Sequence, residues 1–389
     1  MRIERGKKVF EKGNLIFNFI PIGIRIHNPY YFLIKKLVCK KKLDAETFFR
    51  QCDLSYFVQK LNVFMMKKIR GFFLLLGFML VAKVVLGTFG INNESKDCLP
   101  SWNEGNAKKQ LIEYMKRVTD PKSEGYVQPE DRIAVLGLDG TMMVEFPVNF
   151  QRSIAVKRLK ELASHNIPLR NIQPYKSAWE DDGDYYNDKN NHSFVFLKAF
   201  ENFSHEDYVG YVEDFMKTEK APYWKVPFEE LFYKPSLELV EFLRKNGFEV
   251  FVSSTTEEGC IRLLLGKVLG IKSHEVIGNE VDMYCDEKNG KCTFVMTQGF
   301  VNPENRDEGK CRYIVNHIGK RPIFAFGNAM GDYPMLKYTS HSNKENFVMI
   351  LDHDDERREL EYRCDALLDK AQRNGWVVVS MKKDFKNVF

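Results

Sequence analysis

The sequence contains no internal repeat and no low-complexity segment, and after residue 90 it contains no excess of positive charge. Residues 1–90 hold 17 Lys and Arg against 5 Asp and Glu, whereas residues 91–389 hold 41 against 48. The later part is therefore mildly acidic and lacks the basic surface that a nucleic-acid-binding domain requires, so we expect no nucleic acid among the partners. The hydrophobic content of 44% and the 31 Phe residues are typical of a globular chain with one large domain and an insertion, or with two domains.

The first 90 residues differ from the rest in composition. Residues 1–64 form a basic N-terminal extension without sustained periodicity, and a mis-assigned start codon upstream of Met65 would explain them equally well. Residues 65–90 begin with a charged segment and continue with an apolar run, which Lys83 interrupts. This pattern predicts a signal peptide or a single transmembrane anchor, with the membrane contact made through residues 71–90 if the leader is not cleaved. Because the positive charge precedes the apolar run, we expect an exported (periplasmic or extracytoplasmic) protein, or a membrane-anchored one facing outward.

Two cysteines flank a hairpin turn signal. Cys285 and Cys292 lie on either side of Asn289-Gly290, a pair of residues that favours a tight turn between two strands. Export would permit a disulfide between them, whereas two reduced thiols remain the alternative.

Strand and helix patterns alternate from residue 133 onward. Ile133 to Leu136 is a short apolar run bounded by turn residues, as in a buried strand of a parallel sheet. Further strands are predicted over residues 248–253, 321–326, 347–351 and 376–380, and helices over residues 238–246, 261–269 and 312–318. The alternation predicts an α/β fold with a mostly parallel sheet. Between about 147 and 233 the patterns are helical, with an exposed acidic loop expected over residues 177–191.

The turn Asp139-Gly140-Thr141 directly follows the strand at 133–136, where ligands of open α/β sheets bind. On these residues alone an ordinary turn is an alternative. The stretch resembles motif I of the haloacid dehalogenase superfamily, a hydrophobic strand followed by Asp-x-Asp-Gly-Thr. The resemblance implies that Asp139 is the general acid/base and a metal ligand, and that Thr141 supports the phosphate-binding loop. The position of the family's nucleophilic Asp is held by Gly137, so the nucleophile position is degenerate.

Two further stretches resemble motifs II and III. Ser254, at the end of the strand at 248–253, is expected to donate a hydrogen bond to phosphate. Ser or Thr followed by Glu257 also fits the capped start of a helix, whose N-terminus would itself attract phosphate. Lys310 precedes the helix predicted at 312–318 and matches the Lys that neutralises phosphate, although a lone Lys is usually a solvated surface charge.

Motif IV is the stretch from Phe324 to Asp332, which contains Gly-Asn-x-x-Gly-Asp after a strand. The resemblance implies that Asn328 and Asp332 hold magnesium through an amide oxygen and a carboxylate. Met330 stands where the family tends to have an acidic residue, and a thioether contributes nothing to a hard cation.

The resemblance also divides the chain. Residues 91–132 are expected to form a linker and an N-terminal helix, and residues 147–234 a helical cap inserted between motifs I and II. Residues 133–146 and 235–389 would form the Rossmann-like core with its parallel sheet. The ends of this region, Leu99 to Gly105 and Gly375 to Asp384, resemble an exported, phosphoserine-phosphatase-like branch.

The resemblance implies a phosphate-monoester hydrolase that uses Mg²⁺ and acts on a small phosphorylated molecule. Gly137 argues against full activity, because glycine cannot form an aspartyl-phosphate and its presence removes a metal ligand, so that Mg²⁺ binding is weak or lost. We therefore consider a catalytically impaired hydrolase, a non-catalytic phosphate-binding or scaffolding protein (a pseudoenzyme), and a decayed site that binds no phosphate. An Asp side chain is expected to fit at Gly137, which has no evident turn role.

Overall fold

The computed structural model describes residues 97–147, 149–288 and 290–389. The basic extension at 1–64 and the leader at 65–90 lie outside these residues, and both stay predictions. Within the described residues, no helix is both long enough and apolar enough to cross a membrane.

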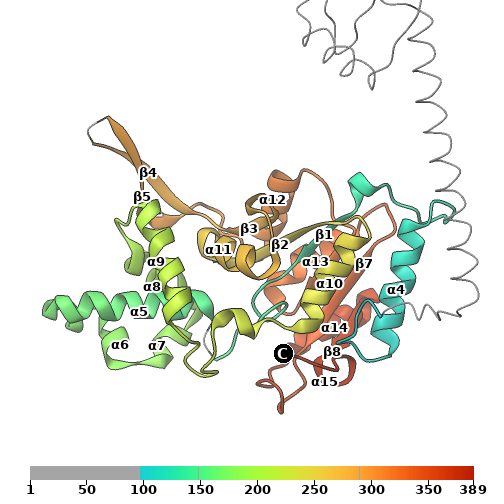
Figure 1. Cartoon of the computed structure of the whole chain (residues 1–389), viewed down its shortest axis with the longest axis horizontal. Coiled ribbons are helices and arrows are strands. Elements are labelled where there is room, and N and C mark those ends of the chain that lie inside the picture. The colour runs from blue at the N-terminus through green and yellow to red at the C-terminus, as the bar shows by residue number, and fades with distance from the viewer. Residues whose placement is uncertain (1–96, 148, 289) are drawn as a thin grey trace, which may run out of the picture. The chain divides into compact units, whose positions relative to one another are not determined.

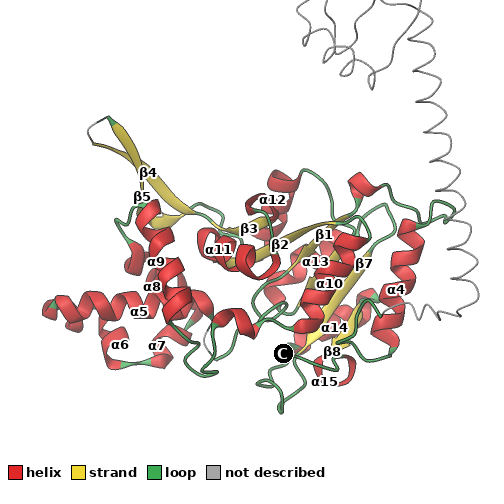
Figure 2. Cartoon of the chain, in the orientation of Figure 1, coloured by secondary structure: helices red, strands yellow, loops and turns green. Residues whose placement is uncertain are grey.

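A six-stranded parallel sheet forms the core (Figure 2). The strands run in the order β3-β2-β1-β6-β7-β8, and all neighbours pair in parallel. Their bounds are β1 (Ile133–Leu136), β2 (Glu249–Glu257), β3 (Val276–Asn279), β6 (Phe324–Gly327), β7 (Phe347–Asp352) and β8 (Val377–Ser380). Strand β1 lies between β2 and β6, with Ala134 opposite Val250 on one side and Phe324 on the other. The predicted α/β class with a parallel sheet is confirmed.

Helices cover both faces of the sheet. Alternate residues of a strand point to opposite faces, so Val135 packs with the first group of helices and Leu136 with the second. The first group consists of α12 (Glu308–Ile318), α13 (Tyr333–Ser340) and α14 (Asp365–Asn374). The second group consists of α4 (Asn106–Thr119), α10 (Lys234–Lys245) and α11 (Glu258–Leu269). This arrangement leaves the carboxyl ends of the strands free to carry a site.

Five helices lie beside the sheet, and we call them the cap helices (Figure 1). They are α5 (Phe150–His165), α6 (Tyr175–Glu180), α7 (Gly183–Asn187), α8 (His192–Phe200) and α9 (His205–Thr218). The exposed loop expected over 177–191 is wrong, because α6 and α7 occupy most of it. The side chain of Asp182 accepts a hydrogen bond from the backbone N–H of Tyr185 and so caps the N-terminus of α7. This cap stabilises a helix in a segment that is otherwise polar.

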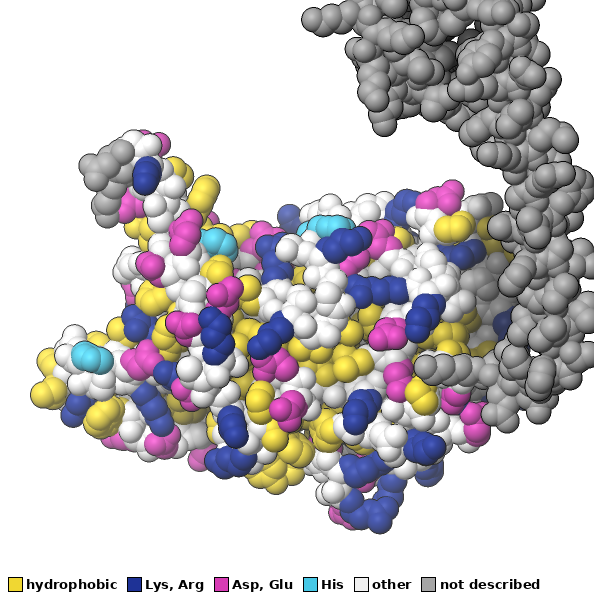
Figure 3. Space-filling view, in the orientation of Figure 1, with side chains coloured by type: hydrophobic (Ala, Val, Ile, Leu, Met, Phe, Trp, Pro, Cys, Tyr) yellow, Lys and Arg dark blue, Asp and Glu magenta, His cyan; other side chains and the backbone are white. Residues whose placement is uncertain are grey.

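An antiparallel hairpin of β4 (Val281–Lys288) and β5 (Lys291–Phe300) follows β3. Its base packs on the cap helices: the rings of Phe196 and Phe300 stack at 6.0 Å, and Met296 donates a backbone hydrogen bond to Phe203 O. The hairpin therefore lies with α8 and α9 although it is distant from them in sequence (Figure 1). The disulfide Cys285–Cys292 joins its strands, so the disulfide is the state that the structure contains. Its outer part exposes Met283, Tyr284 and Phe294 (Figure 3).

The remaining short elements are helix α15 (Met381–Asp384) and the 3₁₀ turns η1 (Pro129–Asp131), η2 (Ile167–Asn171), η3 (Lys189–Asn191), η4 (Phe228–Leu231), η5 (Ser273–Glu275) and η6 (Met330–Asp332).

The described part of the expected linker packs against the rest of the domain. Trp102 is buried against Phe385 at 5.1 Å, and its indole N–H donates to Pro235 O. The boundaries proposed between linker, core and cap stay predictions.

Two element boundaries differ from the sequence-based expectation in ways that affect the site. Strand β2 continues to Glu257, so Ser254 lies inside it rather than after its end. Helix α12 begins at Glu308, so Lys310 belongs to its first turn and does not precede it. Both differences move a predicted site residue from a loop onto a regular element.

Candidate functional site

The loop after β1 lies at the centre of the sheet edge. Gly137 continues the ladder, with its backbone N–H donating to Phe326 O at 2.8 Å. Gly140 has a φ of +69°, and a Cβ there would lie 2.0 Å from Asn328 Nδ2. Only glycine satisfies both the left-handed backbone and this close approach. The turn therefore has a specific geometry that positions Asp139 against the neighbouring strand.

Asp139 is held by two hydroxyl groups of β2. Its Oδ2 atom accepts hydrogen bonds from Ser254 Oγ and Thr256 Oγ1, each at 2.9 Å. Burial raises the pKa of Asp139, and these hydrogen bonds oppose that effect. Sequence reasoning missed Thr256. Side chains two residues apart on a strand point to the same face of the sheet. A predicted strand that continued past residue 253 would therefore have placed Thr256 on the same face as Ser254.

Lys310 is not a solvated surface charge, because only 4% of its surface is exposed. Its Nζ donates to Asp332 Oδ1 at 2.6 Å and to Ser253 O at 3.2 Å. The other oxygen of Asp332 accepts hydrogen bonds from the backbone N–H groups of Asn328 and Ala329. Lys310 and Asp332 thus form a buried ion pair that ties α12 to the loop after β6.

The space expected for a carboxylate at Gly137 is occupied. A Cβ at that position would lie 2.7 Å from Thr141 Oγ1, closer than real Cβ contacts allow. Thr141 Oγ1 is itself fixed, since it donates to Asn328 Oδ1 at 3.0 Å inside the protein. The expectation that an Asp side chain fits at Gly137 is therefore wrong unless Thr141 moves.

The side chains predicted to hold Mg²⁺ have partners within the protein. Asp332 accepts from Lys310 and two backbone N–H groups, Asn328 Oδ1 accepts from Thr141, and Gly137 offers no side chain. In the part of the chain that the structure describes, no three Asp, Glu, His or Cys side chains group in a way that would hold a metal ion. A hard cation prefers several oxygen ligands, so it would compete with these partners for Asp139, Asn328 and Asp332.

The N-terminus of α11 is also occupied. Glu257 accepts hydrogen bonds from the backbone N–H groups of Gly259 and Cys260, each at 2.8 Å, and a third from Tyr208 Oη at 2.5 Å. The expected helix cap by Ser or Thr is therefore wrong, because Glu257 is the capping residue. Its carboxylate takes the donors that a phosphate would use at this helix end.

Two further residues support the loop after β1. His353 donates from Nε2 to Gly140 O at 2.6 Å, and its Nδ1 lies 2.7 Å from Glu359 Oε2. Glu145 accepts from Asn328 Nδ2 at 3.2 Å. Burial, together with the charge of Asp139, raises the pKa of Glu145 to about 7. No sequence signal pointed to either contact, because His353 is 213 residues from Gly140 and Glu145 is 183 residues from Asn328 along the chain.

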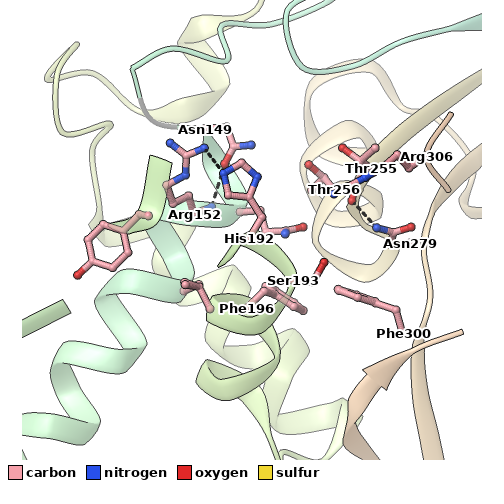
Figure 4. Close-up of a pocket in the computed structure, with 14 residues that line it drawn as sticks. Asn149, Arg152, His192, Ser193, Phe196, Thr255, Thr256, Asn279, Phe300 and Arg306 are labelled. Carbon is pink, nitrogen blue, oxygen red and sulfur yellow. Dashed lines mark hydrogen bonds between the residues drawn. The ribbon is translucent and has the colours of Figure 1, made fainter. Parts of the chain in front are cut away.

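A small cavity of about 40 Å³, partly open to solvent, lies between the sheet edge and the cap helices. Figure 4 shows its two walls: Asn149, Arg152 and His192 come from the cap side, and Thr255, Thr256, Asn279 and Arg306 from the core. Thr256 links the cavity to the Asp139 network, since its hydroxyl donates to that carboxylate.

Comparison with known proteins agrees with this architecture. The haloacid dehalogenase-like hydrolase family matches residues 155–337, a span that contains Ser254, Lys310 and Asn328 but begins after Asp139. The chain has the haloacid dehalogenase fold. A functionally unknown protein from Anaerococcus prevotii superposes with a TM-score of 0.50 at 13% identity, covering 75% of this chain and 98% of that one.

Two other solved structures are similar over less of the chain. A protein of unknown function from Bordetella pertussis gives a TM-score of 0.42 at 15% identity and covers 64% of this chain and 97% of its own. A phosphoserine phosphohydrolase-like protein from Francisella tularensis gives 0.33 at 14% identity, with coverages of 61% and 98%. No curated protein matches.

Proposed function

We propose that this chain is a phosphatase-like protein of the haloacid dehalogenase type that binds a small phosphorylated molecule and hydrolyses phosphate monoesters poorly. The observation that carries this proposal is the nucleophile position. Gly137 supplies no carboxylate, and a Cβ at this position would lie 2.7 Å from Thr141 Oγ1, so a side chain there requires Thr141 to shift.

No other described side chain takes over the missing role. Asp139 keeps both neighbouring hydroxyl groups as hydrogen-bond donors, which fixes its carboxylate against β2. Attack on phosphorus needs an in-line carboxylate, and removing such a nucleophile commonly lowers kcat by several orders of magnitude. Residual turnover would then come only from positioning and electrostatic stabilisation.

A non-catalytic binding or scaffolding role is the second candidate. The ion pair between Lys310 and Asp332 favours this role. In a phosphatase of this type the Lys binds the phosphate of the substrate, whereas here its charge is paired within the protein. A pseudoenzyme of this kind would retain the cavity and lose the chemistry.

Turnover of para-nitrophenyl phosphate, with and without Mg²⁺, separates these possibilities. We expect a rate at or near background together with measurable binding of phenyl phosphate by calorimetry. Turnover comparable to that of an active phosphatase would overturn the impaired-site proposal. A protein that neither turns over nor binds would instead support a decayed site.

We further propose that the protein is exported, or anchored in the membrane facing outward, as in the exported branch that its ends resemble. The leader at 65–90 motivates this, and the Cys285–Cys292 disulfide is consistent with an oxidising compartment. Fractionation of cells that express the chain should place it in the membrane or outside the cytoplasm. A fully cytosolic product would contradict the proposal.

A further inference from the structure

The cavity between the sheet edge and the cap helices contains a cation without an ionic partner. The guanidinium of Arg152 donates to Asn187 Oδ1 at 2.6 Å and to Pro147 O at 3.4 Å, and it lies 3.1 Å from His192 Nε2. Within the described residues, no carboxylate forms an ion pair with Arg152, which is half-buried. Burial lowers the pKa of Arg152, and the charges of Asp139 and Glu145 oppose this effect from a greater distance. An anion in direct contact with the guanidinium would add a closer opposite charge and be stabilised.

The facing wall offers a second guanidinium. Arg306 comes from the core side, opposite Arg152 and His192 (Figure 4). Its only carboxylate neighbour among the described residues is Glu304, at the long distance of 3.9 Å. The described residues that line the cavity include two arginines and no Asp or Glu. The carboxylates next to the cavity are held by lining side chains: Asp139 accepts from Thr256, and Glu304 accepts from Ser193 and Asn279. The two guanidinium groups are therefore the charged groups that face the cavity itself.

The polar groups that sequence reasoning assigned to phosphate are occupied within the protein. Ser254 donates to Asp139, Lys310 is paired with Asp332, and Glu257 takes the N-terminus of α11. A phosphate at those groups would have to break buried hydrogen bonds and an ion pair. At Arg152 it would replace hydrogen bonds to neutral groups with charge-assisted ones, which are roughly twice as strong.

We propose that the phosphate of the ligand binds to Arg152 on the cap side, with Arg306 facing it from the core, and not to Ser254 and Lys310. The inference rests on the proposed function, because it assigns a position to the phosphorylated ligand of the same site. A guanidinium suits this role, since its planar donors match two phosphate oxygens at once.

The apolar part of the cavity defines the remainder of the ligand. Phe196 and Phe300 stack on each other beneath the polar residues, and both are largely buried. An organic group at the mouth of the cavity would contact the edge of Phe300, which is 8% exposed, and add apolar contact to the ionic one. The ligand class is thus a small phosphate monoester with a ring or other apolar group next to its phosphate.

Calorimetric titration of the full chain with phenyl phosphate tests this assignment. Arg152→Ala should weaken binding by roughly 10-fold or more, since it removes a charge-assisted pair. The matched control is Lys160→Ala, which removes a positive charge from the exposed side of the same helix and should change the affinity by less than about 2-fold. Ser254→Ala tests the rival position and should weaken binding less than Arg152→Ala does.

Each outcome distinguishes the inference from the proposed function. If wild type binds phenyl phosphate and Arg152→Ala binds equally well, the inference is overturned while the proposed function stands. If wild type binds neither phenyl phosphate nor inorganic phosphate, both fail. Should Arg152→Ala not fold, Arg152→Lys decides: it keeps the charge but loses the planar pair of donors, and an unchanged affinity would overturn the assignment. Methyl phosphate should bind more weakly than phenyl phosphate if Phe196 and Phe300 contact the organic group.

Discussion

At the scale of single residues, Gly137 and Thr141 act as a pair. Because a Cβ at Gly137 would lie 2.7 Å from Thr141 Oγ1, Gly137→Asp alone should lower the free energy of unfolding by about 1–3 kcal/mol, as overpacking does. Denaturant unfolding measures this loss. An undiminished stability would show that Thr141 moves aside without cost.

Relieving that contact should uncover activity. In Gly137→Asp/Thr141→Ala the new carboxylate gains room and supplies a metal ligand, so that a phosphate can bind beside Ser254 and Lys310 instead of at Arg152. We therefore expect Mg²⁺-dependent hydrolysis of para-nitrophenyl phosphate roughly 10- to 1000-fold above wild type. The gain should fall short of a full enzyme because Met330 and Glu257 remain. Thr141→Ala alone is the control and should stay at background. A folded double variant with no gain would mean that the loss of function extends beyond the nucleophile.

Glu145 should make stability depend on pH. Its folded pKa of about 7 lies above its ordinary value of 4.5, so between these values the folded state binds more protons than the unfolded state. The contribution of Glu145 to stability is therefore present below about pH 4.5 and is lost as the pH rises through about 7. Because Glu145 keeps some solvent contact, the loss should amount to roughly 1–3 kcal/mol.

The variant Glu145→Gln isolates this effect. Asp139 and Glu257 also have raised pKa values and contribute a dependence of the same sign, so wild type and variant must be compared with each other. The difference in unfolding free energy between the two proteins should change between pH 5 and pH 7.5. An equal pH dependence in both would exclude Glu145 as a titrating group in this range.

At the scale of elements, the β4–β5 hairpin depends on its disulfide. The bridge closes a short loop between Cys285 and Cys292, which by chain entropy contributes about 2 kcal/mol. In Cys285→Ser/Cys292→Ser the hairpin tip should be cleaved faster by protease, while the binding of phenyl phosphate stays unchanged. Reduced wild type should behave like the variant, and an equal cleavage rate in the oxidised protein would contradict the prediction.

At the scale of the whole molecule, local patterns predicted the sheet and only part of the site. Strand β1 begins and ends where its apolar run does, because a buried parallel strand needs apolar residues on both faces. The burial of Lys310 could not be predicted, since it depends on Asp332 reaching back from another loop. His353 contacts the loop after β1, and Glu145 contacts Asn328 in the loop after β6, only through tertiary packing, which no periodicity in the sequence reports.

The surface agrees with the charge distribution of the sequence. On the face visible in Figure 3, Lys and Arg side chains are interspersed with Asp and Glu over most of the surface, and several Lys and Arg side chains gather at the lower edge. The expectation that nucleic acid is not a partner stays a prediction. Among the described residues that line the cavity, the charged side chains are Arg152 and Arg306.

The hairpin that packs on α8 and α9 also limits how the cavity can open. The backbone crosses between the sheet and the cap side at four places: before α5, after α9, and at both ends of the hairpin, where Val301 donates to Glu280 O. A lid joined to its base by two adjacent tethers can swing as a rigid body. Here four backbone connections join the two sides of the cavity. A wide opening of the cavity would have to strain several of these connections at once or separate the stacked rings of Phe300 and Phe196. Ligand exchange should therefore proceed through small side-chain and loop displacements at the mouth of the cavity.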